Sequence, residues 1–128
     1  MAYRVLIIDD SPVMRVMVGE MLKALGHEVV GEADNGQGGL DSYKQLKPDL
    51  VTLDISLPDQ DGISVLTKLR RIDLHAKVVI ITGNDQKTLA DKAMALKALG
   101  VLVKPFEESE LGAMLERVEG RARPGGGA

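Results

Sequence analysis

The fold is decided by the stretch Val5-Leu6-Ile7-Ile8-Asp9-Asp10-Ser11-Pro12. Its first four residues are apolar without alternation, which predicts a short strand buried on both faces of a parallel sheet. Ser11 and Pro12 stand where a helix favours a serine cap and a proline in its first turn. The stretch therefore predicts a strand that passes through an acidic turn directly into a helix.

A helix with an apolar stripe is predicted after Pro12. Apolar side chains recur there with a period of about 3.6 residues, and Gly26 stands at the position of a C-terminal cap. The stripe consists of Val13, Met14, Met17, Val18, Met21, Leu22 and Leu25. We expect the methionines of this helix to pack in the core and not to form a partner-binding face.

The same order of strand and helix recurs along the chain. Apolar runs of strand length cover residues 5–8, 28–30, 50–53, 77–81 and 101–103, and helical spacing covers 36–46, 63–72, 86–99 and 107–119. Strands that alternate with helices imply right-handed crossovers and a parallel sheet covered on both faces. We therefore expect an α/β fold built from five strand–helix units.

Composition limits the possible functions. The 128 residues suffice for one domain, and 45% hydrophobic and 27% charged residues are typical of a soluble globular protein. A net charge of −3 argues against nucleic-acid binding, and the absence of cysteine excludes disulfides and thiol catalysis. No apolar run approaches the roughly 20 residues that span a bilayer. We expect a cytoplasmic protein without membrane insertion, a domain at residues 1–120, and a flexible tail, linker remnant or cloning scar at 121–128.

Polar side chains gather at the ends of the predicted strands. Asp9 and Asp10 follow the first apolar run, Asp54 the third, Thr82 the fourth and Lys104 the fifth. Ligands of open parallel sheets bind beyond the carboxyl ends of the strands, so these side chains are expected to converge. Each alone has an ordinary explanation, as an acid that favours a helix N-terminus, a turn residue or a solvated lysine. Their conjunction at four strand ends favours a functional site.

The chemistry of these five residues predicts phosphoryl transfer. Three neighbouring carboxylates repel one another unless a cation neutralises them, and Mg²⁺ is commonly held by carboxylates together with a phosphate oxygen. Lys104 can hold an anionic oxygen as a point charge, and Thr82 can donate a hydrogen bond to another. With Asp54 as the nucleophile, the set predicts Mg²⁺-assisted transfer of a phosphoryl group to the protein itself.

The chain closely resembles the bacterial response-regulator receiver family from Arg4 to about Val118. The matching stretches are VLIIDDS at 5–11, KPDLVTLDI at 47–55, LPDQDG at 57–62, IIT at 80–82 and VKPF at 103–106. The resemblance implies a flavodoxin-like, doubly wound sheet of five parallel strands in the order 2-1-3-4-5. Within the family, VGEADNG at 30–36 and the short chain resemble stand-alone chemotaxis-type regulators.

The resemblance also implies roles in the two-component phosphorelay. Asp54 matches the aspartate that accepts the phosphoryl group from a kinase phosphohistidine. Asp9 and Asp10 match the acidic pair that holds Mg²⁺ with Asp54, and the backbone carbonyl of Ser56 would complete the protein ligands. The implied partners are a sensor histidine kinase or phosphotransfer protein and a downstream protein target, bound through the face of the fourth helix, fifth strand and fifth helix.

The switch implied by the family involves Thr82, whose hydroxyl would turn toward the phosphoryl group, and Lys104, which would pair with that group. The family often has Tyr or Phe three residues before this lysine, where this chain has Val101. We therefore expect the coupling of Thr82 to the target-binding face through position 101 to differ.

In the family, Ser56 and Asn84 stand at positions that tune access of water to the acyl phosphate. The segment 96–100, LKALG, replaces an Ala-Gly-Ala-like turn, so we expect its backbone to differ as well.

Several alternatives stay open beside this interpretation. A haloacid-dehalogenase-like phosphatase also uses an aspartyl nucleophile, but it has an acid where this chain has Ser56, and its metal-binding acids follow the lysine. A flavodoxin-like binding module would need a phosphate-cradling loop where Asp9 and Asp10 stand. A receiver that only docks partners is disfavoured by the intact set of residues, whereas a receiver cut from a longer regulator is not. We expect a phosphorylated switch and not a turnover enzyme.

Overall fold

The structure is a computed structural model that describes residues 2–83 and 87–122, with side chains described as far as residue 117. Across this part of the chain, five strands alternate with five helices, as the sequence predicts. The elements are β1 (Arg4–Ile8), α1 (Pro12–Ala24), β2 (Glu28–Ala33), α2 (Gly36–Leu46), β3 (Leu50–Leu53), α3 (Gly62–Ile72), β4 (Val78–Thr82), α4 (Lys87–Ala95), β5 (Gly100–Val103) and α5 (Glu108–Ala122).

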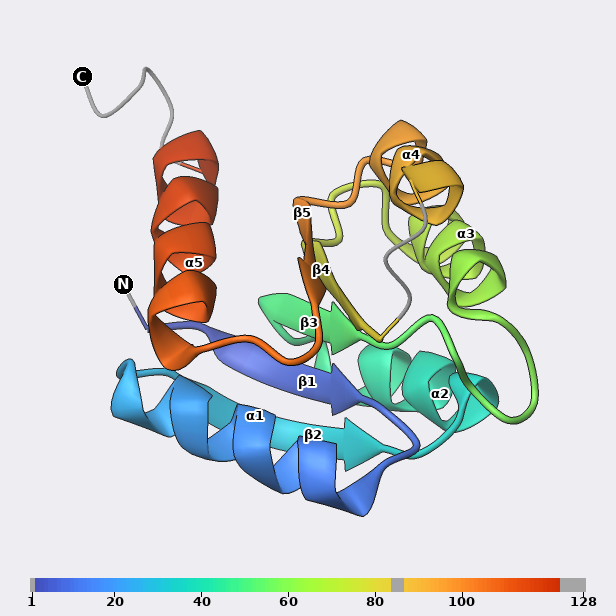
Figure 1. Cartoon of the computed structure of the whole chain (residues 1–128). Helices are drawn as coiled ribbons and strands as arrows, with labels where there is room; N and C mark the ends of the chain where they lie inside the picture. Colours follow the sequence, from blue (N-terminus) through green and yellow to red (C-terminus); the bar gives the residue numbers. More distant parts are fainter. Residues whose placement is uncertain (1, 84–86, 123–128) are drawn as a thin grey trace.

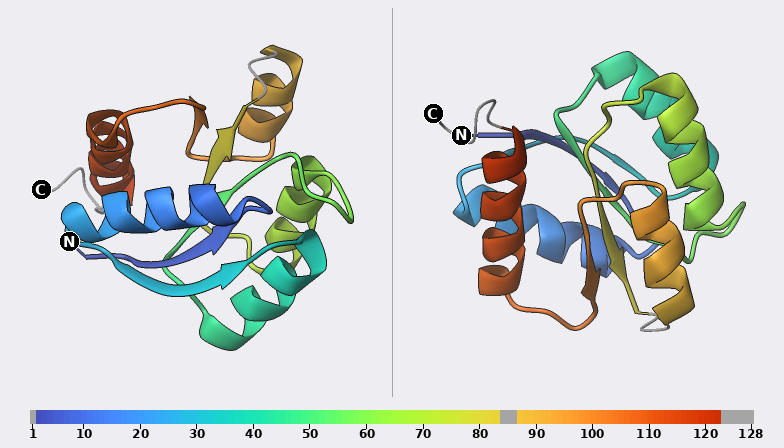
Figure 2. Two further views of the ribbon diagram at one scale, coloured as in Figure 1. Left: turned by 60° about the horizontal axis from the view of Figure 1, so that its bottom comes forward. Right: turned by 90° about the horizontal axis from the view of Figure 1, so that it is seen from above.

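The strands form one parallel sheet in the order β2-β1-β3-β4-β5. Helices α1 and α5 cover one face of the sheet, and α2, α3 and α4 cover the other (Figures 1 and 2). The predicted α/β class and the flavodoxin-like, doubly wound strand order are confirmed.

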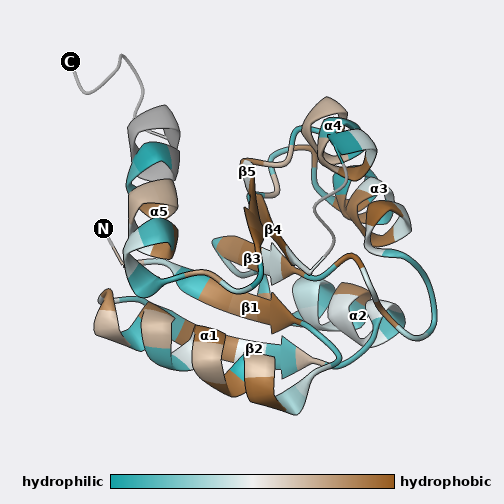
Figure 3. Cartoon of the chain, viewed as in Figure 1, coloured by the Kyte–Doolittle hydropathy of each residue, from teal (hydrophilic) through white to brown (hydrophobic). Residues whose placement is uncertain are grey.

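Each face of the sheet carries its own apolar core. Alternate residues of β1 divide between the two: Val5 and Ile7 pack with residues of α1 and α5, while Leu6 and Ile8 pack with residues of α2 and α3. Strands β3 and β4 are buried along their whole length, whereas β2 at the edge of the sheet is partly exposed. Figure 3 shows the same contrast, with brown in the inner strands and teal at the end of β2.

The pairing of the strands aligns their carboxyl ends. Ile8 pairs with the last residue of β3, and the Asp54 N–H donates to the Ile8 carbonyl at 2.9 Å. The Lys104 N–H donates to the carbonyl of Thr82, the last residue of β4, at 2.8 Å. The polar residues that follow the strands therefore leave the sheet at one edge.

Helix α1 begins and ends as predicted, but its apolar stripe is wider than its buried face. The Ser11 Oγ accepts from the Met14 N–H at 3.2 Å, and Gly26 adopts a φ of 89°. Val13 is 67% exposed and Met17 is 44% exposed. The expectation that the methionines of this helix pack in the core is therefore wrong for Met17. Helix α5 lies near the C-terminal end of α1 and not beside the N-terminal turns of α1, which carry Val13 and Met17 (Figure 1).

Helix α4 is shorter than the predicted 86–99. It ends at Ala95, because Lys97 adopts a φ of 66° in the left-handed region, where the helix cannot continue. Arg70 of α3 donates to the carbonyls of Leu96 and Lys97 at 2.8 and 2.7 Å and so anchors this turn. Gln86 lies outside the described residues.

Helix α5 completes the core on its face of the sheet. Leu111, Met114 and Leu115 are buried as predicted, whereas the side chain of Val118 lies outside the described part. The helix continues to Ala122, past the predicted domain end at residue 120, and residues 123–128 are not described. No helix within 2–83 and 87–122 is long and apolar enough to cross a membrane.

The turn between β3 and α3 leaves no room for a side chain at Gly62. A Cβ there would lie 2.5 Å from the Ile55 Cα and 2.6 Å from the Asp54 carbonyl oxygen. Because backbone atoms cannot give way as a flexible side chain can, Gly62→Ala is expected to lower the free energy of unfolding by about 1–3 kcal/mol. A urea titration measures this difference.

Gly19→Ala is the matched control for that substitution. A Cβ at Gly19 would meet the side chains of Ile7 and Val29 at 3.8 and 3.9 Å, which are ordinary contacts. Alanine inside a helix loses less conformational entropy on folding than glycine, so this variant should gain about 0.5–1 kcal/mol. Equal destabilisation of both variants would contradict the close approach at Gly62.

Candidate functional site

Three carboxylates meet at the carboxyl edge of the sheet. Asp9 and Asp10 continue from β1 and Asp54 continues from β3, and one oxygen of each carboxylate lies within 4.8 Å of the others. Asp9 and Asp54 are 3% and 4% exposed, whereas Asp10 faces solvent. The structure thus brings together the three acids that the sequence indicated as a metal site.

Lys104 is the cation that reaches these acids. Its Nζ lies 2.9 Å from the Asp9 Oδ2 and 3.1 Å from the Asp54 Oδ2, and its side chain is 18% exposed. The residue follows β5, and its peptide bond to Pro105 is cis. One ammonium therefore bridges two buried carboxylates that come from two different strands.

The other oxygen of each buried carboxylate is held by the main chain. The Ser11 N–H donates to the Asp9 Oδ1 at 2.9 Å, and the Ser56 N–H donates to the Asp54 Oδ1 at 3.0 Å. Both side chains are therefore fixed in orientation before any ligand binds. Charge-assisted hydrogen bonds of this kind are stronger than neutral ones.

Thr82 and Lys104 are placed side by side by the pairing of β4 and β5. Thr82 is 1% exposed at the end of β4, and its carbonyl accepts the Lys104 N–H. The sequence indicated both residues at this edge, and the structure places both there.

The electrostatics of the site reflect burial and mutual repulsion. Burial raises the pKa of Asp54 above the ordinary value of an aspartate. The Ser56 N–H and the Lys104 ammonium oppose this rise only in part, and the charge of Asp9 adds to it. Burial alone would lower the pKa of Lys104, but its hydrogen bonds and charge attraction to Asp9 and Asp54 outweigh that effect and raise the pKa. Lys104 consequently stays protonated at neutral pH.

The donor set fits a hard divalent cation. The carboxylates of Asp9, Asp10 and Asp54 offer only oxygen atoms, and no histidine or cysteine joins their cluster in the described part of the chain. One lysine leaves most of their combined charge uncompensated. The exposed side of Asp10 leaves room for the waters that Mg²⁺ retains.

Comparison with known proteins identifies the family of this chain. The model of the response regulator receiver domain matches residues 5–116. The chain belongs to this family. This receiver domain is 38% identical over 118 residues to the chemotaxis protein CheY of Thermotoga maritima, covering 92% of this chain and 98% of that protein. It is 38% identical over 122 residues to the transcriptional regulatory protein PdtaR of Mycobacterium tuberculosis, covering 94% of this chain and 58% of that protein.

The fold of the receiver domain also matches solved structures. A crystal structure of a CheX–CheY–BeF₃–Mg²⁺ complex from Borrelia burgdorferi has a TM-score of 0.89 and 27% identity, covering 91% of this chain and 89% of that chain. The chain is therefore a CheY-like receiver domain of a two-component response regulator, and it does not belong to a class of turnover enzymes. The dehalogenase-like alternative is not favoured.

Val101, which the sequence analysis singled out, lies in β5. Val101 pairs with Ile80 of β4 and packs, partly buried, against the core below α4. The structure therefore has a partly buried aliphatic side chain at this position. Asn84, the other position noted beside Ser56, lies outside the described residues.

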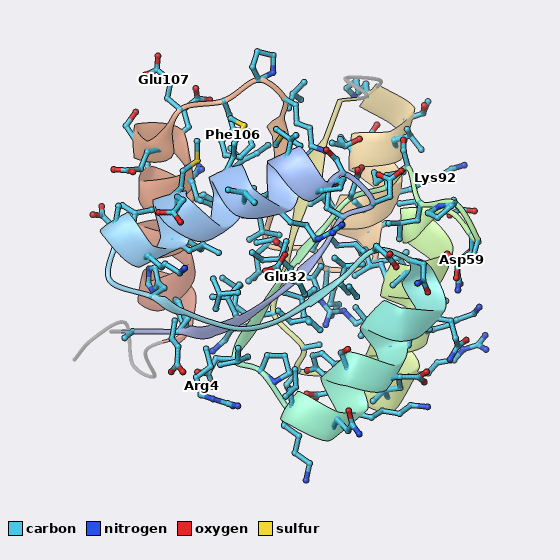
Figure 4. The ribbon with its side chains drawn as sticks, turned by 90° about the horizontal axis from the view of Figure 1, so that it is seen from below. Arg4, Glu32, Asp59, Lys92, Phe106 and Glu107 are labelled. Carbon is cyan, nitrogen blue, oxygen red and sulfur yellow. The ribbon has the colours of Figure 1, made fainter. Side chains whose placement is uncertain are left out.

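Sequence reasoning missed two residues that support the site. Asp59 accepts from the N–H groups of Gly36 and Gln37 at 2.7 and 2.9 Å and ties the loop after β3 to the start of α2 (Figure 4). Those two hydrogen bonds lower the pKa of Asp59. Arg15 of α1 donates to the Asp9 carbonyl at 2.7 Å. Neither contact has a signal in the sequence, because each joins segments whose approach depends on the complete fold.

Removing the charge of Asp54 should stabilise the domain when no metal is present. The folded-state pKa of Asp54 is raised, so wild-type stability falls as the pH rises from the ordinary aspartate value through the folded-state pKa. In EDTA, the free energy of unfolding of Asp54→Asn should therefore exceed that of the wild type by an amount that grows as the pH rises between these two pKa values. The excess should persist at pH 7.5. Urea titrations at several pH values measure the difference.

Asp41→Asn serves as the matched control, because Asp41 is an exposed carboxylate of α2. Its difference from the wild type should stay small across the same pH range. A gain for Asp54→Asn that shrinks as the pH rises would contradict the electrostatic description of the site.

Proposed function

We propose that Asp54 is the phospho-acceptor of this receiver domain and that Asp9, Asp10, Asp54 and the Ser56 backbone carbonyl hold Mg²⁺. The observation that carries the proposal is the position of the Lys104 ammonium within the acidic cluster. It lies 2.9 Å from the buried carboxylate of Asp9 and 3.1 Å from that of Asp54. A phosphoryl group on Asp54 would bring anionic oxygens that Lys104 can pair with. The 4% exposure of Asp54 restricts its contact with water.

The proposed reaction is an in-line transfer from a phosphohistidine. An oxygen of the Asp54 carboxylate attacks phosphorus, an O–P bond forms, and the N–P bond of the donor breaks with its electron pair left on the imidazole nitrogen, which takes up a proton. Lys104 remains protonated and pairs with a phosphoryl oxygen, and Thr82 donates a hydrogen bond to another. Bound Mg²⁺ supplies charge neutralisation for the acids and the transferred group.

The proposed output is a change in affinity for a partner protein. Receiver domains interact with histidine kinases or phosphotransfer proteins and with downstream targets. We assign the target of this chain to the face of α4, β5 and α5, where Met94 and Val103 are 45% and 40% exposed. On phosphorylation, the conformational change would pass from Thr82 toward Val101. Because Val101 is aliphatic, this change would not involve the reorientation of an aromatic ring at that position. A cytoplasmic location and a functional unit at residues 1–120 complete the proposal.

A second candidate is a receiver that controls an attached output domain. It is favoured by the match to PdtaR, of which this chain covers only 58%. The chemotaxis relative from Thermotoga maritima, covered to 98%, favours the stand-alone regulator instead. In both candidates the chemistry at Asp54 is the same.

The test of the proposal is incubation with acetyl phosphate and Mg²⁺, followed by intact mass spectrometry. The wild type should gain one acid-stable, base-labile phosphoryl adduct, and EDTA should abolish it. Asp54→Asn should gain none, because an amide does not form an acyl phosphate. Asp41→Asn, which removes an exposed carboxylate of α2, should be labelled as fully as the wild type.

Two outcomes would overturn the proposal. An undiminished adduct on Asp54→Asn would place the phosphoryl group elsewhere. Release of many equivalents of phosphate without a lasting adduct would instead revive the phosphatase alternative.

A further inference from the structure

Arg15 joins the acidic turn to the neighbouring strand β2. Its Nη1 donates to the main-chain carbonyl of Asp9 at 2.7 Å, and its Nε donates to the Glu32 Oε1 at 3.1 Å. The side chains of Arg15 and Glu32 are 19% and 49% exposed. Glu32 pairs with Ile7 in the register of β2 and β1 and therefore lies level with the end of β1 (Figure 4). One guanidinium thus links α1, β2 and the turn that carries the acids.

The bond from Arg15 completes the anchoring of Asp9. The Asp9 N–H donates to the Ala33 carbonyl at 3.0 Å, and its two carboxylate oxygens accept from the Ser11 N–H and the Lys104 ammonium. The carbonyl is the remaining acceptor, and Arg15 occupies it. All polar groups of Asp9 are therefore partnered.

Asp10 differs from Asp9 in how it is held. It faces solvent, and its carboxylate makes no hydrogen bond within residues 2–83 and 87–122. The peptide that joins Asp9 to Asp10 is planar, so the direction of the Asp9 carbonyl fixes the direction in which the chain enters Asp10. By holding that carbonyl, Arg15 restricts the orientation of the backbone from which the Asp10 side chain extends.

We propose that Arg15 is a positioning residue for Mg²⁺, acting through the Asp9–Asp10 peptide, and that Glu32 holds its guanidinium in place. The inference rests on the proposed function, because it takes Asp9, Asp10 and Asp54 as the metal ligands. Arg15 is not a ligand itself, since a guanidinium carries no acceptor atom. Glu32 also offsets a positive charge that would otherwise oppose the binding of a cation.

The test compares Arg15→Met with Lys23→Met. Both changes remove one positive charge from α1, but Lys23 lies in the last turn and is 64% exposed. The Mg²⁺ dissociation constant is measured by isothermal titration calorimetry on the unphosphorylated protein. Arg15→Met should bind Mg²⁺ about tenfold more weakly, since loss of an outer-sphere partner typically costs 10- to 100-fold. Lys23→Met should bind as the wild type does.

The sign of the change separates positioning from simple electrostatics. If Arg15 acted only through its charge, its removal would relieve repulsion of the cation and tighten Mg²⁺ binding. Unchanged or tighter binding by Arg15→Met would therefore overturn the inference. Saturating Mg²⁺ should restore phosphorylation of Arg15→Met to near the wild-type rate, because the acceptor itself is intact.

Two further variants keep the inference testable where Arg15→Met does not fold in a urea titration. Arg15→Lys keeps the charge but cannot reach both partners, so its affinity for Mg²⁺ should lie between those of Arg15→Met and the wild type. Glu32→Gln keeps an acceptor but leaves the charge of Arg15 uncompensated, so it should weaken Mg²⁺ binding less than Arg15→Lys does. Wild-type affinity in Arg15→Lys would overturn the inference.

The experiments on Asp54 and on Arg15 distinguish failure of the proposed function from failure of the positioning role. Absence of a phosphoryl adduct on Asp54, together with weaker Mg²⁺ binding by Arg15→Met, would overturn the proposed function and support the positioning role. A normal adduct with unchanged Mg²⁺ binding by Arg15→Met would overturn only the role of Arg15. A wild type that does not bind Mg²⁺ would overturn both.

Discussion

The main physical constraint on the site is the repulsion between three carboxylates that the sheet brings together at one edge. Asp9, Asp10 and Asp54 lie within 4.8 Å of one another, and two of them are buried. Two like charges at such a distance cost about 4 kcal/mol near a protein surface. The ammonium of Lys104 offsets part of this cost by bonding to both buried acids. In the proposed function, Mg²⁺ would offset the remaining negative charge, including the charge that a phosphoryl group adds.

The surrounding fold keeps these charges together by over-determining their positions. The carboxyl ends of β1 and β3 are paired in register, and those of β4 and β5 are tied by the bond from Lys104 to Thr82. Main-chain N–H groups hold one oxygen of Asp9 and one of Asp54. Because these contacts are rigid, the site cannot relax its repulsion by moving apart. Burial of Asp54, with a smaller contribution from the charge of Asp9, is why the pKa of Asp54 stays raised beside a lysine.

Much of this arrangement could be predicted from the sequence. Continuous apolar runs such as 50–53 identify buried parallel strands, and the topology of such sheets carries the residues after each run to one edge. What could not be predicted depends on how segments pack together. The exposure of Met17 follows from where α5 lies, the end of α4 follows from the left-handed Lys97, and the bond of Arg15 follows from the approach of α1 to the Asp9 turn. The exposure of Met17 and the bond of Arg15 depend on how helices pack and have no local signal, whereas the unusual LKALG sequence at 96–100 indicated a different backbone but not where α4 ends.

The most direct measurement of the central claim is the free energy of unfolding as a function of Mg²⁺ concentration at constant ionic strength. If Mg²⁺ relieves the repulsion at the site, the wild type should be stabilised by about 1.4 kcal/mol for each tenfold increase above the dissociation constant. Asp10→Asn, with one charge removed from the cluster, should need more Mg²⁺ for the same gain. A free energy of unfolding that does not depend on Mg²⁺ would contradict the account.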